Sequence, residues 1–258
     1  MVRGIDKFRE FFGDYAENYV IIGGTACEIY EEQYAQIPRA TKDIDIILVV
    51  EALSAEFVTQ FWEFVKAANY DERNKGVGKN KQEYYRFKKP ENTDFPYQVE
   101  LFSRNIGLKG FPEDARITPI PVDEDLSSLS AILMDDNYYN FTLKHSSIDD
   151  GIHLANIESL ICLKVKAYLD LANRRNEGEQ VDKKHIEKHK KDVFRLSAML
   201  SAESSFDAPD TLKSDIHDFC ERIQRDEPNA DFFKAAGLPK SITAEQLINQ
   251  IKKSFKIE

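Results

Sequence analysis

Hydrophobic positions in the first 70 residues switch between helical spacing and short continuous apolar runs. Aromatic residues at helical spacing predict an amphipathic helix over residues 4–16 and another over residues 55–68. The apolar runs at residues 19–22 and 43–50 predict two buried strands, and the segment from Thr25 to Tyr34 is compatible with a helix. This part of the chain therefore predicts a sheet flanked by helices.

The pattern changes near residue 155. Before it come four strand-like segments, of which the first two are expected to pair: residues 82–88, 97–103, 139–145 and 152–155. After it come four segments with helical periodicity: residues 157–175, 183–202, 211–225 and 243–254. We therefore predict an α+β fold, with a mixed sheet and flanking helices in residues 1–155 and an all-helical C-terminal domain in residues 156–258.

Two aspartates open the apolar run at residues 43–50. Asp43 and Asp45 are two positions apart, so on a strand both carboxylates project from one face while Ile44 projects from the other. Such like charges repel each other, and a pair of divalent cations relieves the repulsion. The two aspartates are therefore either a metal site for phosphoryl transfer or a solvated strand entry where Asp43 caps a turn.

Glu100 is the candidate for a third carboxylate. It alternates with Val99 and Leu101, so it faces away from that apolar pair. An exposed strand glutamate is the alternative interpretation, and Asp94 is a second candidate that lies in the preceding turn.

A glycine pair ends the first predicted strand, where a helix is expected to begin. Gly23 and Gly24 would let the backbone approach a phosphate, and the free N–H groups of a helix start favour an anion. The hydroxyl of Thr25 could add a donor. An ordinary strand-to-helix turn remains the alternative, and no Gly-Lys-Ser/Thr follows as in a Walker A loop.

The composition of the chain limits which cellular compartment and which binding partners are expected. The formal net charge of −10 argues against a broad nucleic-acid footprint, although not against a local basic patch. Basic and aromatic residues interleave between Arg73 and Lys89, where an RNA grip and a solvated loop are both open. The sequence has only three scattered cysteines and shows no signal peptide. It also contains no apolar run near the ~20 residues of a membrane span. We therefore expect a cytoplasmic protein with no membrane segment.

One lysine interrupts an apolar stripe in the predicted helix at 157–175. The stripe comprises positions 157, 160, 161, 164, 168 and 171, and Lys164 is its only member that is neither apolar nor aromatic. A core-facing lysine needs a partner or a phosphate, unless its stem packs and its ammonium reaches water. Lys166 lies off the stripe, and we expect it at the surface.

Taken in order, these parts resemble the nucleotidyltransferases of the DNA polymerase β-like superfamily. The shared pattern is a hydrophobic strand, a Gly-Gly turn, an Asp-hydrophobic-Asp pair and a later strand acid. The lysine-bearing helix, followed by Lys190-Lys-Asp-Val-Phe-Arg-Leu196, resembles the AbiEii-type toxin family, with Arg195 where that pattern more often has an acid. Eighteen residues separate Gly24 from Asp43, a longer gap than is usual, which an extra helical turn and the Pro38 loop could absorb.

The resemblance implies roles for individual residues. The implied metal ligands, for two Mg²⁺ ions, are Asp43, Asp45 and Glu100. The implied phosphate-holding turn is Gly23, Gly24 and Thr25. Lys164 would contact the triphosphate, and Asp192 would orient Lys164 or a substrate group.

The resemblance also implies an activity, namely transfer of a nucleotide from an NTP to an acceptor. In the AbiEii-type family the acceptor would be RNA, such as tRNA, and the enzyme would be a toxin inhibited by an antitoxin protein. Two alternatives stay open. One is nucleotidylation of a small hydroxylated molecule such as an aminoglycoside, which the acidic net charge would attract. The other is a degenerate protein that binds nucleotide or a partner without catalysis.

Overall fold

The computed structural model describes residues 2–70, 85–102 and 135–257 of the 258-residue chain. These residues form two compact units. The first contains the described residues up to 102 together with 146–155, and the second contains residues 135–145 and 156–257. The chain passes from the first unit to the second after Ala155, the residue at which the sequence suggests a boundary, but residues 135–145 already belong to the second unit.

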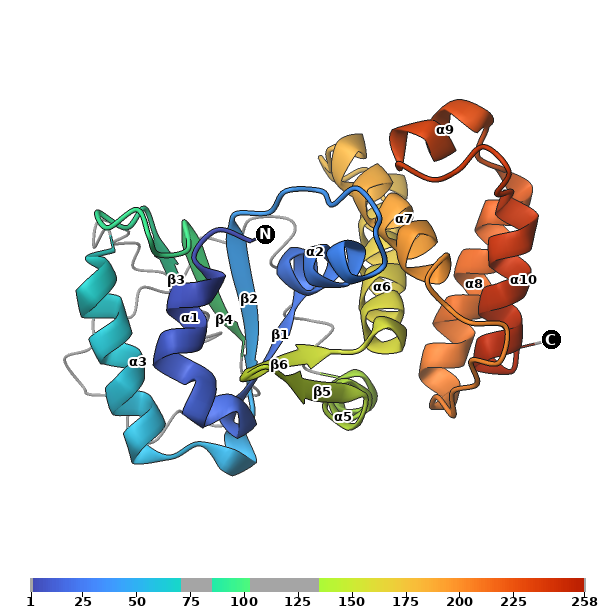
Figure 1. The fold of residues 1–258 in the computed structure, drawn as a ribbon. Coiled ribbons are helices and arrows are strands. Elements are labelled where there is room, and N and C mark those ends of the chain that lie inside the picture. The colour runs from blue at the N-terminus through green and yellow to red at the C-terminus, as the bar shows by residue number, and fades with distance from the viewer. Residues whose placement is uncertain (1, 71–84, 103–134, 258) are drawn as a thin grey trace. The chain divides into compact units, whose positions relative to one another are not determined.

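The first unit is built on a mixed sheet, which among the described residues has six strands in the order β3-β4-β2-β1-β6-β5 (Figure 1). The strands are β1 (Tyr19–Ile22), β2 (Asp43–Leu48), β3 (Tyr85–Lys88), β4 (Gln98–Phe102), β5 (Ser146–Asp149) and β6 (Ile152–Ala155). The helices are α1 (Ile5–Phe12), α2 (Gly23–Gln33) and α3 (Ala55–Ala68), with 3₁₀ turns η1 (Gly13–Asn18) and η2 (Val50–Ala52). Strand β2 runs parallel to β4 and antiparallel to β1, which in turn runs parallel to β6.

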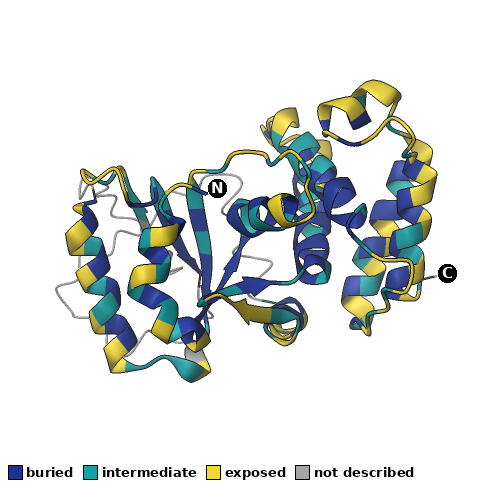
Figure 2. Cartoon of the chain, viewed as in Figure 1, coloured by how far each residue is buried: buried dark blue, intermediate teal, exposed yellow. Residues whose placement is uncertain are grey.

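An aromatic layer holds α1 and α3 against one face of this sheet. The ring of Phe8 on α1 meets Tyr19 of β1 edge-on at 5.2 Å, and Phe61 on α3 meets Phe87 of β3 at 5.4 Å. Such edge-to-face pairs add to the burial of large apolar rings, each of which removes roughly 150–250 Å² from water. Helix α2 lies on the other side of the sheet (Figure 1). The two faces are therefore covered differently, and the strands between them are largely buried (Figure 2).

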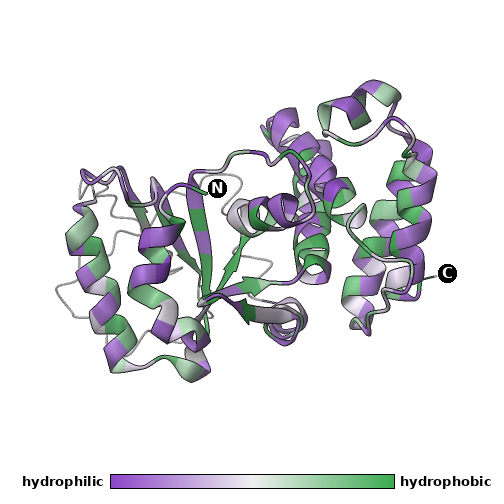
Figure 3. Ribbon diagram, in the orientation of Figure 1, coloured by the Kyte–Doolittle hydropathy of each residue, from purple (hydrophilic) through white to green (hydrophobic). Residues whose placement is uncertain are grey.

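The second unit is helical. Its elements are α5 (Asp136–Lys144), α6 (Ile157–Asn176), α7 (Lys183–Ser197), α8 (Asp210–Arg225), α9 (Ala230–Ala235) and α10 (Ala244–Phe255). Helix α6 packs against α5, α7 and α8 and is buried on several sides, whereas α8 and α10 alternate hydrophobic and hydrophilic positions (Figure 3). This pattern suits a central helix surrounded by amphipathic ones.

The predicted α+β class, with a mixed sheet and flanking helices, is confirmed, but some elements were predicted wrongly. The aromatic content of residues 139–145 favours a strand, whereas residues 139–144 belong to helix α5 and His145 is its C-cap. The side chain of Asp135 caps this helix by accepting from the N–H groups of Asn137 and Tyr138. Strand β5 and the short helix α9 were not anticipated. None of the helices in the described ranges has the length and apolar character needed to cross a bilayer.

Candidate functional site: a carboxylate face beside a glycine turn

The three predicted acids lie on one face of two neighbouring strands. In the parallel pairing of β2 with β4, Asp45 is opposite Glu100 and Asp43 is opposite Gln98. Paired positions on neighbouring strands share a face, and so do residues two apart on one strand. The backbone therefore brings Asp43, Asp45 and Glu100 together, and the residues between them point into the opposite, aromatic layer, where Ile44 and Val99 are fully buried.

Burial makes this group of charges costly. Glu100 is 5% exposed, and Asp43 and Asp45 are partly exposed. The interpretation of Glu100 as an exposed strand glutamate is therefore wrong. Like charges on a partly buried surface raise the free energy of the fold unless cations or hydrogen-bond donors offset them.

The donor set fits a hard divalent cation. Neighbouring strands lie about 4.8 Å apart, so carboxylates at paired positions are within reach of one ion, and oxygen ligands of this kind suit Mg²⁺. As positioned, no three His, Cys, Asp or Glu side chains in the described part of the chain are already clustered as a metal site. The chain thus supplies three carboxylates at suitable backbone positions without a closed ligand cage.

The glycine turn lies directly against this face. Gly23 has φ of +71°, and a Cβ built on it would overlap Oδ2 of Asp45 and lie 2.9 Å from Cγ of the same residue. A side chain at this position would therefore both strain the backbone and displace the carboxylate. Helix α2 begins here, and its N-cap residue Ile22 makes no side-chain capping hydrogen bond. The turn thus combines a carboxylate with the positive end of a helix.

Thr25 has a different contact from the one predicted. It is fully buried, and its hydroxyl donates to the backbone carbonyl of Asp43 at 2.6 Å. This bond uses the hydroxyl proton within the protein and ties the start of α2 to the start of β2. Thr25 therefore holds the glycine turn and the aspartate strand in register.

The long gap between Gly24 and Asp43 forms a strap that returns to the glycine turn. Two buried glutamates of α2 anchor it, because Glu28 accepts from the N–H of Thr41 at 2.7 Å and Glu31 from the N–H of Arg39 at 2.9 Å. A Cβ on Gly24 would lie 2.9 Å from Oγ1 of Thr41 and 3.9 Å from the guanidinium of Arg39. Sequence reasoning missed these residues, although two acids on a packed helix signal that backbone donors are needed nearby.

The second unit holds the predicted lysine. Lys164 is 7% exposed, as its place on the helical stripe predicts, and its Nζ lies 2.9 Å from Oδ2 of Asp192. The side chains of the pair are 8% and 3% exposed, so both charges are largely desolvated. The contact joins α6 to α7 and brings together the two residues that the family resemblance connects.

Lys166 has a separate partner. Its Nζ lies 2.9 Å from Oδ2 of Asp215, which also accepts from the hydroxyl of Tyr138 at 2.8 Å. The Lys166 side chain is 34% exposed, less than expected for a surface lysine. Tyr138 is buried, and burial raises the pKa of its hydroxyl, which therefore donates rather than ionises. This cluster connects α5, α6 and α8 within the second unit.

Comparison of the chain with protein-family models, with curated proteins and with solved structures found no match.

Proposed function

We propose that this protein is a nucleotidyltransferase that transfers a nucleotide from an NTP to a hydroxyl group. The observation that carries the proposal is the shared face of Asp43, Asp45 and Glu100 beside the Gly23 turn. Partly buried carboxylates are costly to the fold, and a divalent cation offsets that cost. The adjoining helix start gives a negatively charged phosphate chain a complementary environment.

In the proposed reaction the oxygen of the acceptor hydroxyl attacks the α-phosphorus of the NTP. A new P–O bond forms, the bond from the α-phosphorus to the bridging oxygen breaks, and pyrophosphate leaves. Glu100 takes the hydroxyl proton, and Asp43 and Asp45 would hold the cations. Bound Mg²⁺ would supply charge neutralisation at the attacking and leaving oxygens. Positioning and charge account for most of the catalysis.

We predict that Lys164 contacts the triphosphate and that Asp192 orients Lys164. The buried ion pair supports the second role, since a carboxylate 2.9 Å from an ammonium restricts its position.

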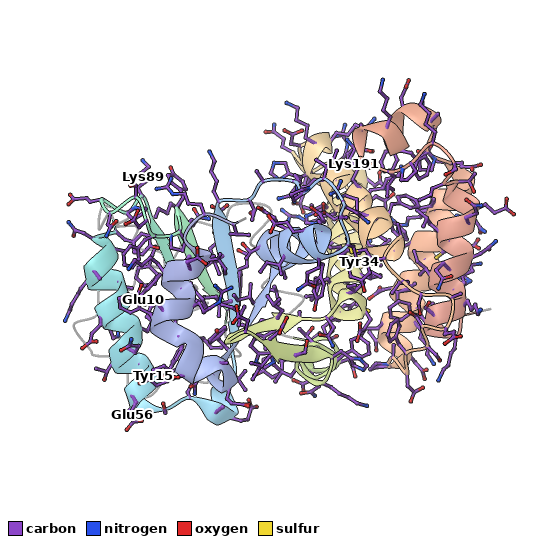
Figure 4. All side chains as sticks on the ribbon, viewed as in Figure 1. Glu10, Tyr15, Tyr34, Glu56, Lys89 and Lys191 are labelled. Carbon is purple, nitrogen blue, oxygen red and sulfur yellow. The ribbon has the colours of Figure 1, made fainter. Side chains whose placement is uncertain are left out.

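We propose RNA as the acceptor, with the basic helix α7 as one surface that could hold it. Lys183 and Lys184 at its start are exposed, and Lys191, labelled in Figure 4, lies over the ring of Phe232 at 5.8 Å. Such lysines neutralise phosphates, and an aromatic ring offers a stacking surface. Most of the other basic segment, residues 73–84, lies outside the described residues. A toxin role with an inhibiting antitoxin rests on the family resemblance alone.

The activity is tested by incubating the protein with each α-labelled NTP, Mg²⁺ and total RNA. We expect label in RNA with wild type, and a loss of about 10²-fold or more with Asp45→Asn, the scale found when one electrostatic group is removed from an active site. Asp149→Asn is the matched control, because Asp149 is an exposed strand aspartate of the same unit. Equal labelling by Asp45→Asn and wild type would refute the metal-site assignment.

The acceptor is tested separately by reversing charge at Lys183 and Lys184. The variant with both Lys183→Glu and Lys184→Glu should have a higher apparent KM for RNA. Its slope of log affinity against log salt concentration should become shallower by about 0.7–0.9 for each phosphate that the protein no longer neutralises. The KM for NTP should stay unchanged. If label enters an aminoglycoside but not RNA, the small-molecule alternative is correct.

A further inference from the structure

Lys190 on α7 is a buried lysine beside an aromatic ring. The residue is 7% exposed, and its Nζ lies 5.2 Å from the ring centroid of Phe232 on α9. Among the described residues this lysine forms no ion pair with a carboxylate. A desolvated ammonium group raises the free energy of the fold unless an anion compensates it, and a cation–π contact offsets only part of that cost.

A second lysine lies over the same ring. The Nζ of Lys191 is 5.8 Å from the Phe232 centroid, so the two ammonium groups are at most about 11 Å apart. This separation is close to the Debye length of about 8–10 Å, so salt only partly screens their repulsion. Phe232 and Lys191 are both partly exposed, which leaves the ring and its cations accessible from the surface.

The neighbouring acids do not compensate these two charges. Asp192 follows them on α7 and is paired with Lys164 at 2.9 Å. Glu187 lies one turn earlier, and together with burial its charge raises the pKa of the Tyr168 hydroxyl on α6, which places it near that ring. Asp231 on α9 is exposed. Within the described ranges none of these acids forms an ion pair with either lysine, so the two ammonium groups lack a counter-ion there.

Arg195 fixes α9 beside the lysines. Its Nη1 donates to the backbone carbonyl of Ala236, the C-cap of α9, and a Cβ on Gly237 would lie 2.9 Å from the same nitrogen. The ring of Phe232 also meets Phe194 of α7 edge-on at 5.6 Å. The ring and the cations are therefore held in place before a ligand binds, which lowers the entropic cost of binding.

The basic positions continue along α7 beyond this ring. Lys184 and Lys191 are two helical turns apart, so they share one side of the helix at a separation of about 10 Å. A nucleic-acid strand, which carries a phosphate at every nucleotide, can contact both positions. An aromatic ring beside the cations suits a strand whose bases are unpaired, because such bases stack on aromatic side chains.

We propose that the α7–α9 surface formed by Lys190, Lys191 and Phe232 binds the RNA acceptor. A backbone phosphate is the counter-ion of Lys190, and an adjacent base stacks on the Phe232 ring. No bond is made or broken at this surface. The inference rests on the proposed nucleotidyltransferase function with RNA as acceptor.

The test measures binding of a short, fluorescein-labelled single-stranded RNA to the full chain by fluorescence anisotropy. It is done at several salt concentrations in EDTA, so that the proposed metal site does not contribute. Lys190→Met keeps an apolar stem against the ring and removes the charge. Lys213→Met is the matched control, because Lys213 is a partly buried lysine of α8 that has no ion pair within the described residues.

We expect Lys190→Met to bind the RNA about tenfold more weakly or worse, since a hydrogen bond to a charged group is lost. Its slope of log affinity against log salt concentration should become shallower by about 0.7. Its thermal midpoint should stay at or above that of wild type, because a desolvated charge is removed. Lys213→Met should match wild type in affinity and slope. Wild-type affinity and slope in Lys190→Met would overturn the inference.

A second variant covers the case in which Lys190→Met does not fold. Lys191 is partly exposed, so Lys191→Met should keep the fold, and its salt slope should also become shallower by about 0.7. An unchanged slope would again overturn the inference. Competition identifies the source of the anion. Equal displacement of RNA by ATP, at the same phosphate concentration, would assign the surface to free nucleotide, and equal displacement by poly-glutamate would assign it to an acidic protein. Either result would overturn RNA as the ligand.

Failure of this inference can be told apart from failure of the proposed function. Wild-type protein that binds RNA through Lys190 but transfers no label would overturn only the proposed catalysis. Wild-type protein that labels RNA, with RNA affinity unchanged in both lysine variants, would overturn only this binding surface.

Discussion

The buried ion pair between Lys164 and Asp192 is a contact whose stabilising and functional roles can be separated by mutation. Removing one partner leaves the other charge buried without its counter-ion, which usually costs about 3–5 kcal/mol. Replacing both with apolar residues of similar size is often nearly neutral. A purely structural pair and a substrate-contacting pair therefore predict different behaviour of the double variant.

We expect Lys164→Met and Asp192→Leu each to lower the free energy of unfolding by about 3–5 kcal/mol, and the double variant to regain most of it. If Lys164 contacts the triphosphate as proposed, turnover should stay low in the double variant, because the ammonium group is absent. Urea unfolding and labelled-NTP incorporation measure the two effects. Recovery of turnover in the double variant would show that the pair only stabilises the fold. Lys166→Met is the control, and its turnover should stay within about twofold of wild type.

Gly23→Ala tests the contact between the glycine turn and the aspartate strand. The change introduces a Cβ that overlaps Oδ2 of Asp45 and places alanine at φ +71°. Gly178→Ala is the control, because Gly178 has φ of +95° but open space around its would-be Cβ. Both variants should lose about 1–2 kcal/mol from backbone strain, whereas only Gly23→Ala should lose most of its Mn²⁺ affinity and turnover. If the two variants have the same Mn²⁺ affinity and turnover, the close approach of Gly23 to Asp45 is not needed for activity.

At this scale the sequence predicted the residues whose place follows from periodicity. The two-residue repeat of a strand put Asp43 and Asp45 on one face, and the helical stripe put Lys164 in the interior. It could not predict the bond from Thr25 to the Asp43 carbonyl or the bond from Gln98 to Glu100. These depend on strand register and rotamers, which a single-strand pattern does not contain.

At the scale of elements, the strap between α2 and β2 depends on two buried carboxylates. Hydrogen bonds to charged groups contribute about 1.5–3 kcal/mol each, so Glu28 and Glu31 together hold the backbone of Thr41 and Arg39 firmly. The strap carries Arg39, whose exposed position makes it accessible to trypsin once the backbone is released.

We therefore expect Glu28→Ala and Glu31→Ala each to increase the rate of tryptic cleavage after Arg39, by about tenfold for each 1.4 kcal/mol by which the anchoring is weakened. Mass spectrometry of the early digest measures this rate. Glu32→Ala, an exposed position on the same helix, should leave the rate unchanged. Equal cleavage in all three variants would show that the carboxylates do not fix the strap.

Helices and strands with a strong hydrophobic periodicity were predicted more accurately than those with a weak one. Helix α3 matches its predicted range, because its aromatic stripe is long and Ser54 caps it. Most of helix α5 was predicted as a strand over residues 139–145, since Tyr139 and Phe141 favour strands locally. Burial at helical spacing and the Asp135 cap decide the outcome. Strand β5 was missed because most of its residues are polar and exposed, so it lacks the apolar run by which the equally short β1 and β6 were predicted.

At the scale of the whole molecule, buried thiols make the free energy of unfolding depend on pH in the alkaline range. Burial raises the pKa of Cys220 to about 12, and burial also raises the pKa of Cys162. In an unfolded chain a thiol ionises near pH ~8.5. The stabilisation is therefore fully present below about pH 8.5 and is lost as the pH rises toward the folded-state pKa.

Above about pH 9.5, and below the folded-state pKa, each such thiol should lower the free energy of unfolding by about 1.4 kcal/mol per pH unit. Urea unfolding at a series of pH values measures the slope. Cys220→Ala should have a shallower slope than wild type by the contribution of one thiol. An unchanged slope would mean that Cys220 does not ionise when the chain unfolds.

The parallel pairing of β1 with β6 has a consequence for how the chain folds while it is being synthesised. Ile21 pairs with Leu154, so the partner of an early strand leaves the ribosome only after more than half of the chain has been made. Until then one edge of the apolar strand Tyr19–Ile22 is open to pairing with other nascent chains. A translation pause between residues 102 and 152 would prolong that exposure, so chaperone demand should be greatest in this interval.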